Sequence, residues 1–196
     1  STESISELIA LSFEVNLRDF RTLILNAVSP HIKNIESTHV VADALRKEIT
    51  RHKQFEGAKW ALTAKDLSLY QELLDSIIFL NTLYKNAWLF DDTYVQLPYK
   101  RSNTKWILQK QDELRLKALE EIVNENGIEG IWNFIQMVKC PESLSHSIVT
   151  YFDDKLNNDI FRKYKSKELT EDFTKSYLLE LYRKDTSRYK IWAKDI

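Results

Sequence analysis

The chain has 196 residues, of which 43% are hydrophobic and 29% charged, and its formal net charge is −1. This composition excludes a disordered chain, because burial of so many apolar residues offsets the entropy lost on folding. The near balance of 28 basic and 29 acidic residues also excludes a general electrostatic attraction to nucleic acid or anionic membranes.

Only three glycines and three prolines are present, which favours long helices over a turn-rich β fold. Apolar spacing predicts helices over residues 3–13 and 17–28, and a third to about His52, with Ser37 and Thr38 as its caps. Residues 54–60 are expected to form a loop that turns its two aromatic side chains, Phe55 and Trp60, into the core.

A fourth helix is predicted to begin at Thr63, where Asp66 three residues later forms a capping box. A short helix or turn follows over residues 83–90. Residues 91–103 are the longest stretch without a helical pattern, and they mark a boundary between two halves. A long helix is expected from about Thr104, ended at Gly127 because glycine adopts the left-handed backbone that ends helices.

Further helices are predicted over 128–139, from a cap at Ser143 to about 153, over 157–165, over 168–184, and from about Thr186. The pattern predicts an all-α fold of stacked antiparallel helix pairs, either a solenoid-like α/α superhelix or an irregular helical bundle. We expect an N-terminal helical half over 1–90, a linker loop over 91–103 and a C-terminal half over 104–196, or one continuous domain. Both ends of the sequence read as boundaries inside a longer polypeptide.

No motif for a metal, a cofactor or covalent catalysis stands out. Cys140 is the only cysteine, so neither an intrachain disulfide nor a Cys-based zinc site is expected. The acidic pair Asp91 and Asp92 lacks the third acid of a magnesium motif, and it reads as the polar end of a helix. The histidines lack metal-ligand spacing, and three glycines cannot build a phosphate loop. We therefore predict no metal, no cofactor and no enzymatic activity.

A secretion signal and an apolar run of about 18 residues, the length that spans a membrane, are both missing from the sequence. Together with the single cysteine, these observations predict a cytoplasmic protein without a membrane partner.

One enzymatic alternative stays open. Arg46 and His52 have the Arg-then-His spacing of the all-α ribonucleases of the HEPN class, in which these two residue types act on RNA. Lys47 stands where those enzymes usually have another polar residue. This hypothesis requires both side chains to share a cleft, and burial of either one in the core counts against it.

A second alternative is a helical module that binds single-stranded nucleic acid. Stacking rings beside phosphate-binding cations suit single strands, and two clusters combine them: one around residues 99–106, the other around residues 183–192. We instead favour an interaction surface for protein on the loop over residues 91–106, since binding residues concentrate on loops carried by rigid scaffolds. Its predicted members are Tyr94, Tyr99, Lys100, Arg101 and Lys105.

Three segments resemble a known family. They are residues 51–62 (Arg-His-Lys-Gln-Phe-Glu-Gly-Ala-Lys-Trp-Ala-Leu), residues 86–90 (Asn-Ala-Trp-Leu-Phe), and residues 126–131 followed by 138–141. They are similar to the helical scaffold or sensor region of large bacterial multidomain proteins of the STAND type, P-loop NTPases associated with defence. The resemblance covers about residues 45–150 and departs near His146. It implies a helical scaffold that binds other protein surfaces, either segments of its parent chain or a partner protein, without a nucleotide site in this segment.

Overall fold

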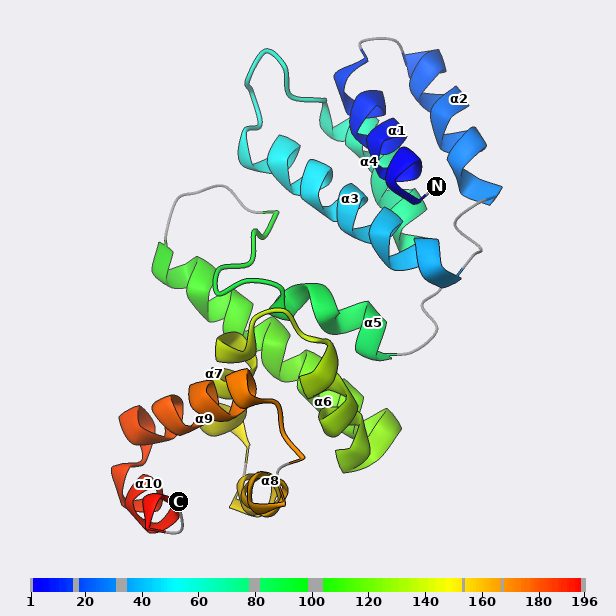
Figure 1. Ribbon diagram of the computed structural model, residues 1–196. Coiled ribbons are helices and arrows are strands. Elements are labelled where there is room, and N and C mark those ends of the chain that lie inside the picture. The colour runs from blue at the N-terminus through cyan, green and yellow to red at the C-terminus, as the bar shows by residue number, and fades with distance from the viewer. Residues whose placement is uncertain are drawn as a thin grey trace. The chain divides into compact units, whose positions relative to one another are not determined.

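The computed structural model describes residues 2–15, 18–30, 35–77, 82–98, 104–152, 154–166 and 168–194. These residues form helices and connecting turns without strands, which confirms the predicted all-α class. The chain divides into two compact units (Figure 1): unit 1 comprises Ser1–Lys85 and Gln96–Ile107, and unit 2 comprises Asn86–Val95 and Leu108–Ile196. The predicted linker over residues 91–103 is therefore divided between the two units. Residues 91–95 belong to unit 2, and the described residues 96–98 belong to unit 1.

Unit 1 contains α1 (Thr2–Glu14), α2 (Arg18–Val28), α3 (Ile35–Gln54) and α4 (Ala64–Asp75), together with most of the short helix α5 (Thr82–Asn86). α1 packs against both α2 and α3, and α4 packs against α3. α1 and α2 run in opposite directions (Figure 1). Because α3 begins at Ile35, the expected caps Ser37 and Thr38 lie inside its first turn instead.

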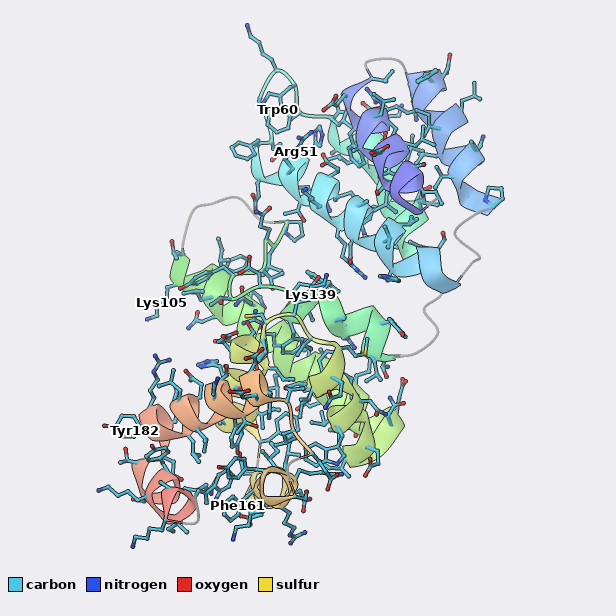
Figure 2. All side chains as sticks on the ribbon, viewed as in Figure 1. Arg51, Trp60, Lys105, Lys139, Phe161 and Tyr182 are labelled. Atoms are coloured by element: carbon cyan, nitrogen blue, oxygen red, sulfur yellow. The ribbon has the colours of Figure 1, made fainter. Side chains whose placement is uncertain are left out.

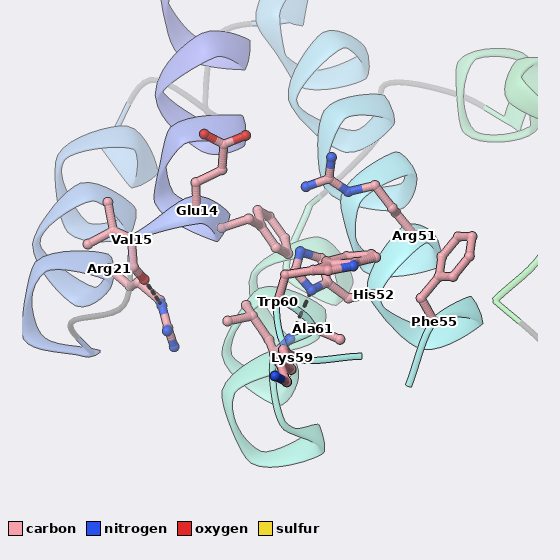
Figure 3. A pocket seen from close by; sticks show the side chains of 11 residues that line it. Glu14, Val15, Arg21, Arg51, His52, Phe55, Lys59, Trp60 and Ala61 are labelled. Atoms are coloured by element: carbon pink, nitrogen blue, oxygen red, sulfur yellow. Dashed lines mark hydrogen bonds between the residues drawn. The ribbon is translucent and has the colours of Figure 1, made fainter. Parts of the chain in front are cut away.

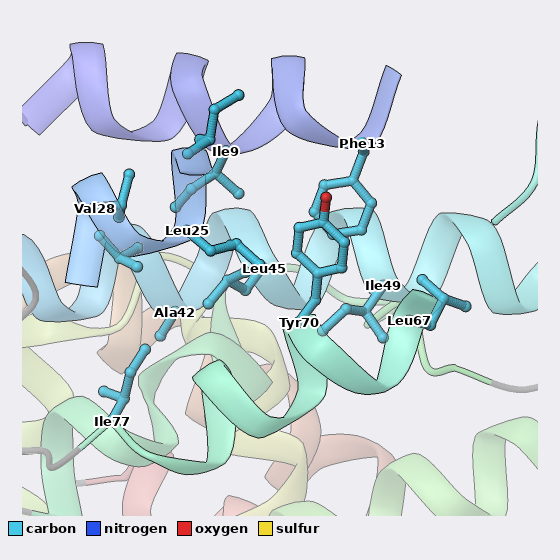
Figure 4. Close-up of a cluster of buried hydrophobic side chains, with 12 residues drawn as sticks. Ile9, Phe13, Leu25, Val28, Ala42, Leu45, Ile49, Leu67, Tyr70 and Ile77 are labelled. Carbon is cyan, nitrogen blue, oxygen red and sulfur yellow. The ribbon is translucent and has the colours of Figure 1, made fainter. Parts of the chain in front are cut away.

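The core of unit 1 is an apolar cluster contributed by α1 to α4 (Figure 4). Its deepest aromatic contact is the stack of Phe13 on Tyr70, with ring centroids 3.8 Å apart. The buried Tyr70 hydroxyl lies 3.0 Å from the Ser12 carbonyl oxygen, to which it donates a hydrogen bond, so its polar atom is satisfied. The fully buried members of the cluster include Ile9, Val41, Ala42, Leu45 and Tyr70.

Thr63 is the N-cap of α4, as predicted, and the Asp66 carboxylate accepts from the Thr63 hydroxyl at 2.8 Å. Thr63 Oγ1 accepts a hydrogen bond from the Asp66 N–H at 3.2 Å. We expect Thr63→Ala to lower the free energy of unfolding by about 1 kcal/mol, because the first-turn N–H loses its acceptor. Urea denaturation measures the change, with Lys65→Ala in the same exposed turn as the control. Equal effects of the two substitutions contradict the prediction.

Unit 2 begins at Asn86, the last residue of α5, and includes the 3₁₀ turn η2 (Ala87–Phe90). α7 and α10 each pack against α9, and α7 also contacts η2. Trp192 is buried and stacks on Phe161 and Tyr177, with centroids 4.4 and 5.6 Å away. The helices of unit 2 are α6 (Thr104–Met137) from Leu108 onward, α7 (Pro141–Tyr151), α8 (Asp154–Lys165), α9 (Glu171–Lys184) and α10 (Thr186–Ala193).

The long helix α6 is broken at Gly127, as predicted. Gly127 has φ 64° and ψ −162°, a backbone conformation that side chains with a Cβ rarely adopt. Gly130 matters for a different reason: a Cβ there would lie 2.6 Å from the Asn126 Cβ. The two glycines therefore let the chain turn sharply and continue as a second helix.

The expected cap at Ser143 is wrong, because Pro141 already occupies the first position of α7, where its missing N–H costs nothing. Ser143 is buried instead. Each unit taken by itself is a helical bundle, and the solenoid-like arrangement stays a prediction. None of the described helices is long and apolar enough to cross a membrane.

Candidate functional site

A pocket of about 530 Å³ opens in unit 1, where the ends of α1 and α3 meet the turn before α4 (Figure 3). Its volume is within the range of about 300–1,000 Å³ typical of ligand sites. We call it the aromatic pocket, because Phe13, His52, Phe55 and Trp60 form much of its wall. Its other lining residues are Glu14, Val15, Arg21, Arg51, Lys59, Ala61 and Leu62.

His52 is the innermost polar residue of the aromatic pocket, with 1% of its surface exposed. Its Nδ1 accepts a hydrogen bond from the Leu62 N–H at 2.9 Å. A nitrogen that accepts carries no proton, so in the neutral ring the proton is on Nε2. The ring stacks on Phe13 at 5.3 Å and meets the edge of Trp60 at 5.1 Å, measured between centroids. These contacts fix both the tautomer and the ring orientation.

The pKa of His52 is lowered from 6.5 to about 4. Burial is the main cause, because it penalises the charged imidazolium. The positive charges of Arg51 and then Arg21 add to the effect. At neutral pH, His52 is therefore a neutral residue whose Nε2–H is a hydrogen-bond donor.

Arg51 and two half-exposed aromatic residues, Phe55 and Trp60, form the rim of the pocket (Figure 3). The Arg51 guanidinium carbon lies 5.3 Å from the centroid of the Trp60 ring, in a cation–π contact. Trp60 is 49% exposed and Phe55 47% exposed, so the expectation that both turn into the core is wrong. The physical reason is that Phe13, His52 and Tyr70 already fill the space beneath the loop.

Two buried donors of the pocket residues, Arg51 Nε and His52 Nε2, have no hydrogen-bond partner among the residues that the structure describes, and the same holds for Glu48 Oε2 on α3 next to Arg51. Glu48 Oε2 lies 3.0 Å from Arg51 Nη2, an ion pair without hydrogen-bond geometry. More than about 90% of buried polar groups in proteins are hydrogen-bonded. Arg51 Nε–H and His52 Nε2–H belong to the same pocket. They therefore indicate that an acceptor, either a water molecule or a ligand, bonds to them there.

The structure does not bring Arg46 and His52 together. Arg46 lies six residues earlier on α3, about 120° away around the helix axis, and donates to Asp43 Oδ1 at 2.9 Å. Arg46 is also missing from the described lining of the aromatic pocket. His52 is buried, which is the arrangement that counts against the ribonuclease hypothesis.

The predicted interaction surface is described only in part. Tyr94 is 68% exposed and belongs to unit 2. Lys105 is exposed on the first turn of α6 and belongs to unit 1 (Figure 2). Tyr99, Lys100 and Arg101 lie outside the described residues. In the second basic-aromatic cluster, Trp192 is buried and cannot stack on a base.

The segment that carries Tyr94 is held by two buried side chains of α6. Gln111 accepts from the Val95 N–H at 2.8 Å and donates to the Thr93 carbonyl at 2.9 Å. Arg115, 3% exposed, donates to the Leu89 and Asp92 carbonyls at 2.8 and 2.7 Å. The segment therefore has a fixed backbone, although it has no regular secondary structure.

Of the acidic pair, the Asp91 carboxylate is paired with Lys139 at 3.1 Å. Asp92 is bonded through its backbone carbonyl, which accepts from Ser143 Oγ at 3.0 Å. Among the described residues, no group of three His, Cys, Asp or Glu side chains is placed to hold a metal ion.

Sequence reasoning missed the aromatic pocket because its lining comes from three separate segments. One signal was present: a basic residue and a histidine at a helix end, followed by a loop with Phe55 and Trp60. That signal was interpreted as core packing for the aromatics and as catalysis for His52.

Comparison of the chain with protein-family models, with curated proteins and with solved structures found no match. The resemblance to STAND-type proteins therefore rests on the three sequence segments alone and stays a prediction.

Proposed function

We propose that this chain is a helical protein-interaction domain and that the aromatic pocket of unit 1 is its contact site. One observation carries the proposal. Two buried donors, Arg51 Nε and His52 Nε2, lack partners among the described residues, and they line a pocket whose rim exposes Phe55 and Trp60.

The chemistry of the rim supports a protein partner. Trp, Tyr and Arg are the residues most enriched among binding hot spots, where a few side chains supply most of the affinity. Here Trp60 and Arg51 are already stacked on each other, so little side-chain freedom is lost when a partner covers them. The ring of Trp60 is further fixed by Phe55, with centroids 5.6 Å apart.

The partner is either another segment of a longer parent chain or a separate protein, and the STAND-type resemblance supports a role within a larger bacterial signalling or defence protein. Helical arrays serve such roles because they offer wide surfaces without a catalytic centre. For the nucleic-acid alternative, the burial of Trp192 removes one of the rings that supported it.

Selection of a displayed random peptide library on the immobilised protein tests this function. We expect a set of enriched peptides whose affinity falls about thirty-fold with Trp60→Ala, because the substitution removes the central aromatic contact. Fluorescence polarisation of labelled peptides measures the affinities.

Two variants serve as controls in this experiment. Phe20→Ala removes an aromatic residue of similar exposure on α2, away from the pocket, and should leave affinity unchanged. Tyr94→Ala tests the rival surface on residues 91–106. Peptides that lose affinity with Tyr94→Ala but not with Trp60→Ala overturn the assignment of the pocket, and the absence of enriched peptides overturns the interaction function itself.

A further inference from the structure

Resting on the proposed function, we infer that the aromatic pocket recognises an acidic side chain, Asp or Glu, within a peptide segment that also carries a neighbouring aromatic or large aliphatic residue. The carboxylate accepts hydrogen bonds from His52 and Arg51 inside the pocket. The apolar neighbour packs on Phe55 and Trp60 at the rim.

The two unpartnered donors of the pocket determine that the ligand group must be a hydrogen-bond acceptor. His52 offers only an Nε2–H, because its Nδ1 is engaged by the Leu62 N–H. Arg51 offers its Nε–H, and guanidinium groups are donors only. Both atoms are buried and lack partners among the described residues, so the group that binds between them must accept. A carboxylate accepts at both of its oxygens and donates at neither when ionised.

The charges around the pocket favour a singly charged acceptor. Arg21 is paired with Asp66 at 3.2 Å, and Arg51 is paired with Glu48 at 3.0 Å. Each of these cations is therefore largely compensated within the protein. Glu14 and Lys59, both exposed, add one charge of each sign to the lining. With these charges balanced, a doubly charged phosphate would leave two negative charges uncompensated here, whereas a carboxylate leaves only one.

The apolar rim explains why the acidic residue needs a neighbour. Phe55 and Trp60 expose about half of their surfaces around the opening, and aromatic side chains contribute most of their binding energy by burial. Because this rim lies at the surface of unit 1, a peptide backbone can continue across it while one acidic side chain enters the pocket (Figure 3). The inferred partner is therefore an internal segment and not a free carboxyl terminus.

Paired peptide libraries test this inference. The two libraries have blocked termini and random flanking positions, and they differ only at a central residue, Glu in one and Gln in the other. We expect peptides from the Glu library to bind about ten-fold more tightly than their Gln counterparts, since a charged acceptor makes the stronger hydrogen bonds. We also expect enrichment of aromatic or large aliphatic residues beside the Glu. A third library, with Gln at the centre and a free carboxyl terminus, distinguishes a terminal carboxylate from a side chain.

Two variants at His52 distinguish the role of its Nε2–H as a donor to the ligand from the role of its Nδ1 as the acceptor for the Leu62 N–H. His52→Asn places an amide oxygen near the Nδ1 position, so it keeps an acceptor for the Leu62 N–H but has no group at Nε2. His52→Gln places its amide near the Nε2 position. We expect the Glu preference to disappear in His52→Asn and to persist in part in His52→Gln, while binding through the apolar neighbour remains in both.

Arg51→Lys supplies a second test that does not depend on the buried ring. Lysine keeps the charge and loses the guanidinium donors, so the Glu preference should fall while the fold is unaffected at this half-exposed position. Peptides that bind, require Trp60 and show no preference for Glu over Gln overturn the carboxylate inference and leave the interaction function standing. Stronger binding of the library with the free carboxyl terminus overturns the internal-segment assignment.

Discussion

Replacing Arg115 by Met is expected to lower the free energy of unfolding of unit 2 by about 3 kcal/mol, because the substitution removes several charge-assisted hydrogen bonds and leaves one buried carbonyl without its donor. The Arg115 side chain is buried and donates to the carbonyls of Leu89 and Asp92. Its guanidinium carbon also lies 5.6 Å from the centroid of the Phe90 ring. Methionine keeps the apolar stem but supplies none of these hydrogen bonds, so the Leu89 carbonyl loses its donor and the Asp92 carbonyl keeps only the one from Ser143 Oγ.

Urea denaturation measures the total effect, and amide hydrogen exchange locates it. We expect residues 89–95 to exchange faster in Arg115→Met, since the side chain fixes that segment. Arg162→Met, on α8 of the same unit, is the matched control, because Arg162 is exposed and pairs with Asp159 one turn away. Such surface pairs contribute about 0–1 kcal/mol. A loss of stability in Arg115→Met no larger than in Arg162→Met contradicts the role of Arg115 as the clamp of this segment.

The helices of this chain were predictable because local rules determine them. The N-cap of α4 depends on Thr63 and Asp66, three residues apart, and the break in α6 depends on the conformational freedom of Gly127. Apolar periodicity located the remaining helices for the same reason: it reports which face of each helix is buried. Helix ends were less predictable. α7 begins at Pro141 and not at Ser143, because a proline at the first helical position competes with a serine cap two residues later.

The candidate site was less predictable because it depends on tertiary packing. Nothing in the sequence near Trp60 indicates that Phe13, from α1, stacks on the His52 ring that Trp60 contacts. The tautomer of His52 depends on the Leu62 N–H, a contact across a turn that periodicity does not describe. The folded structure, and not the local sequence, therefore makes Nε2 of His52 a buried donor. Only the residue types of the site could be predicted from the sequence.

Acidification is expected to destabilise unit 1 through His52. The unfolded imidazole binds a proton below about pH 6.5, whereas in the folded protein the pKa is about 4. Between these two values the unfolded state holds more protons, so the free energy of unfolding falls as the pH is lowered from 6.5 to 4. Below pH 4 both states are protonated, and His52 causes no further loss. The shift corresponds to about 3 kcal/mol across this window.

His52→Asn isolates this contribution, because it keeps an acceptor for Leu62 and cannot titrate in this range. We expect the difference in unfolding free energy between the wild type and this variant to shrink by about 3 kcal/mol from pH 7 to pH 4, measured by urea denaturation at each pH. Nitrogen-15 NMR of the His52 ring provides an independent measurement, since it reports both the Nε2–H tautomer and the titration. A ring that titrates near pH 6.5, or one protonated at Nδ1 at neutral pH, contradicts the prediction. The same result would remove His52 as a fixed donor in the aromatic pocket, so this measurement also tests the basis of carboxylate recognition.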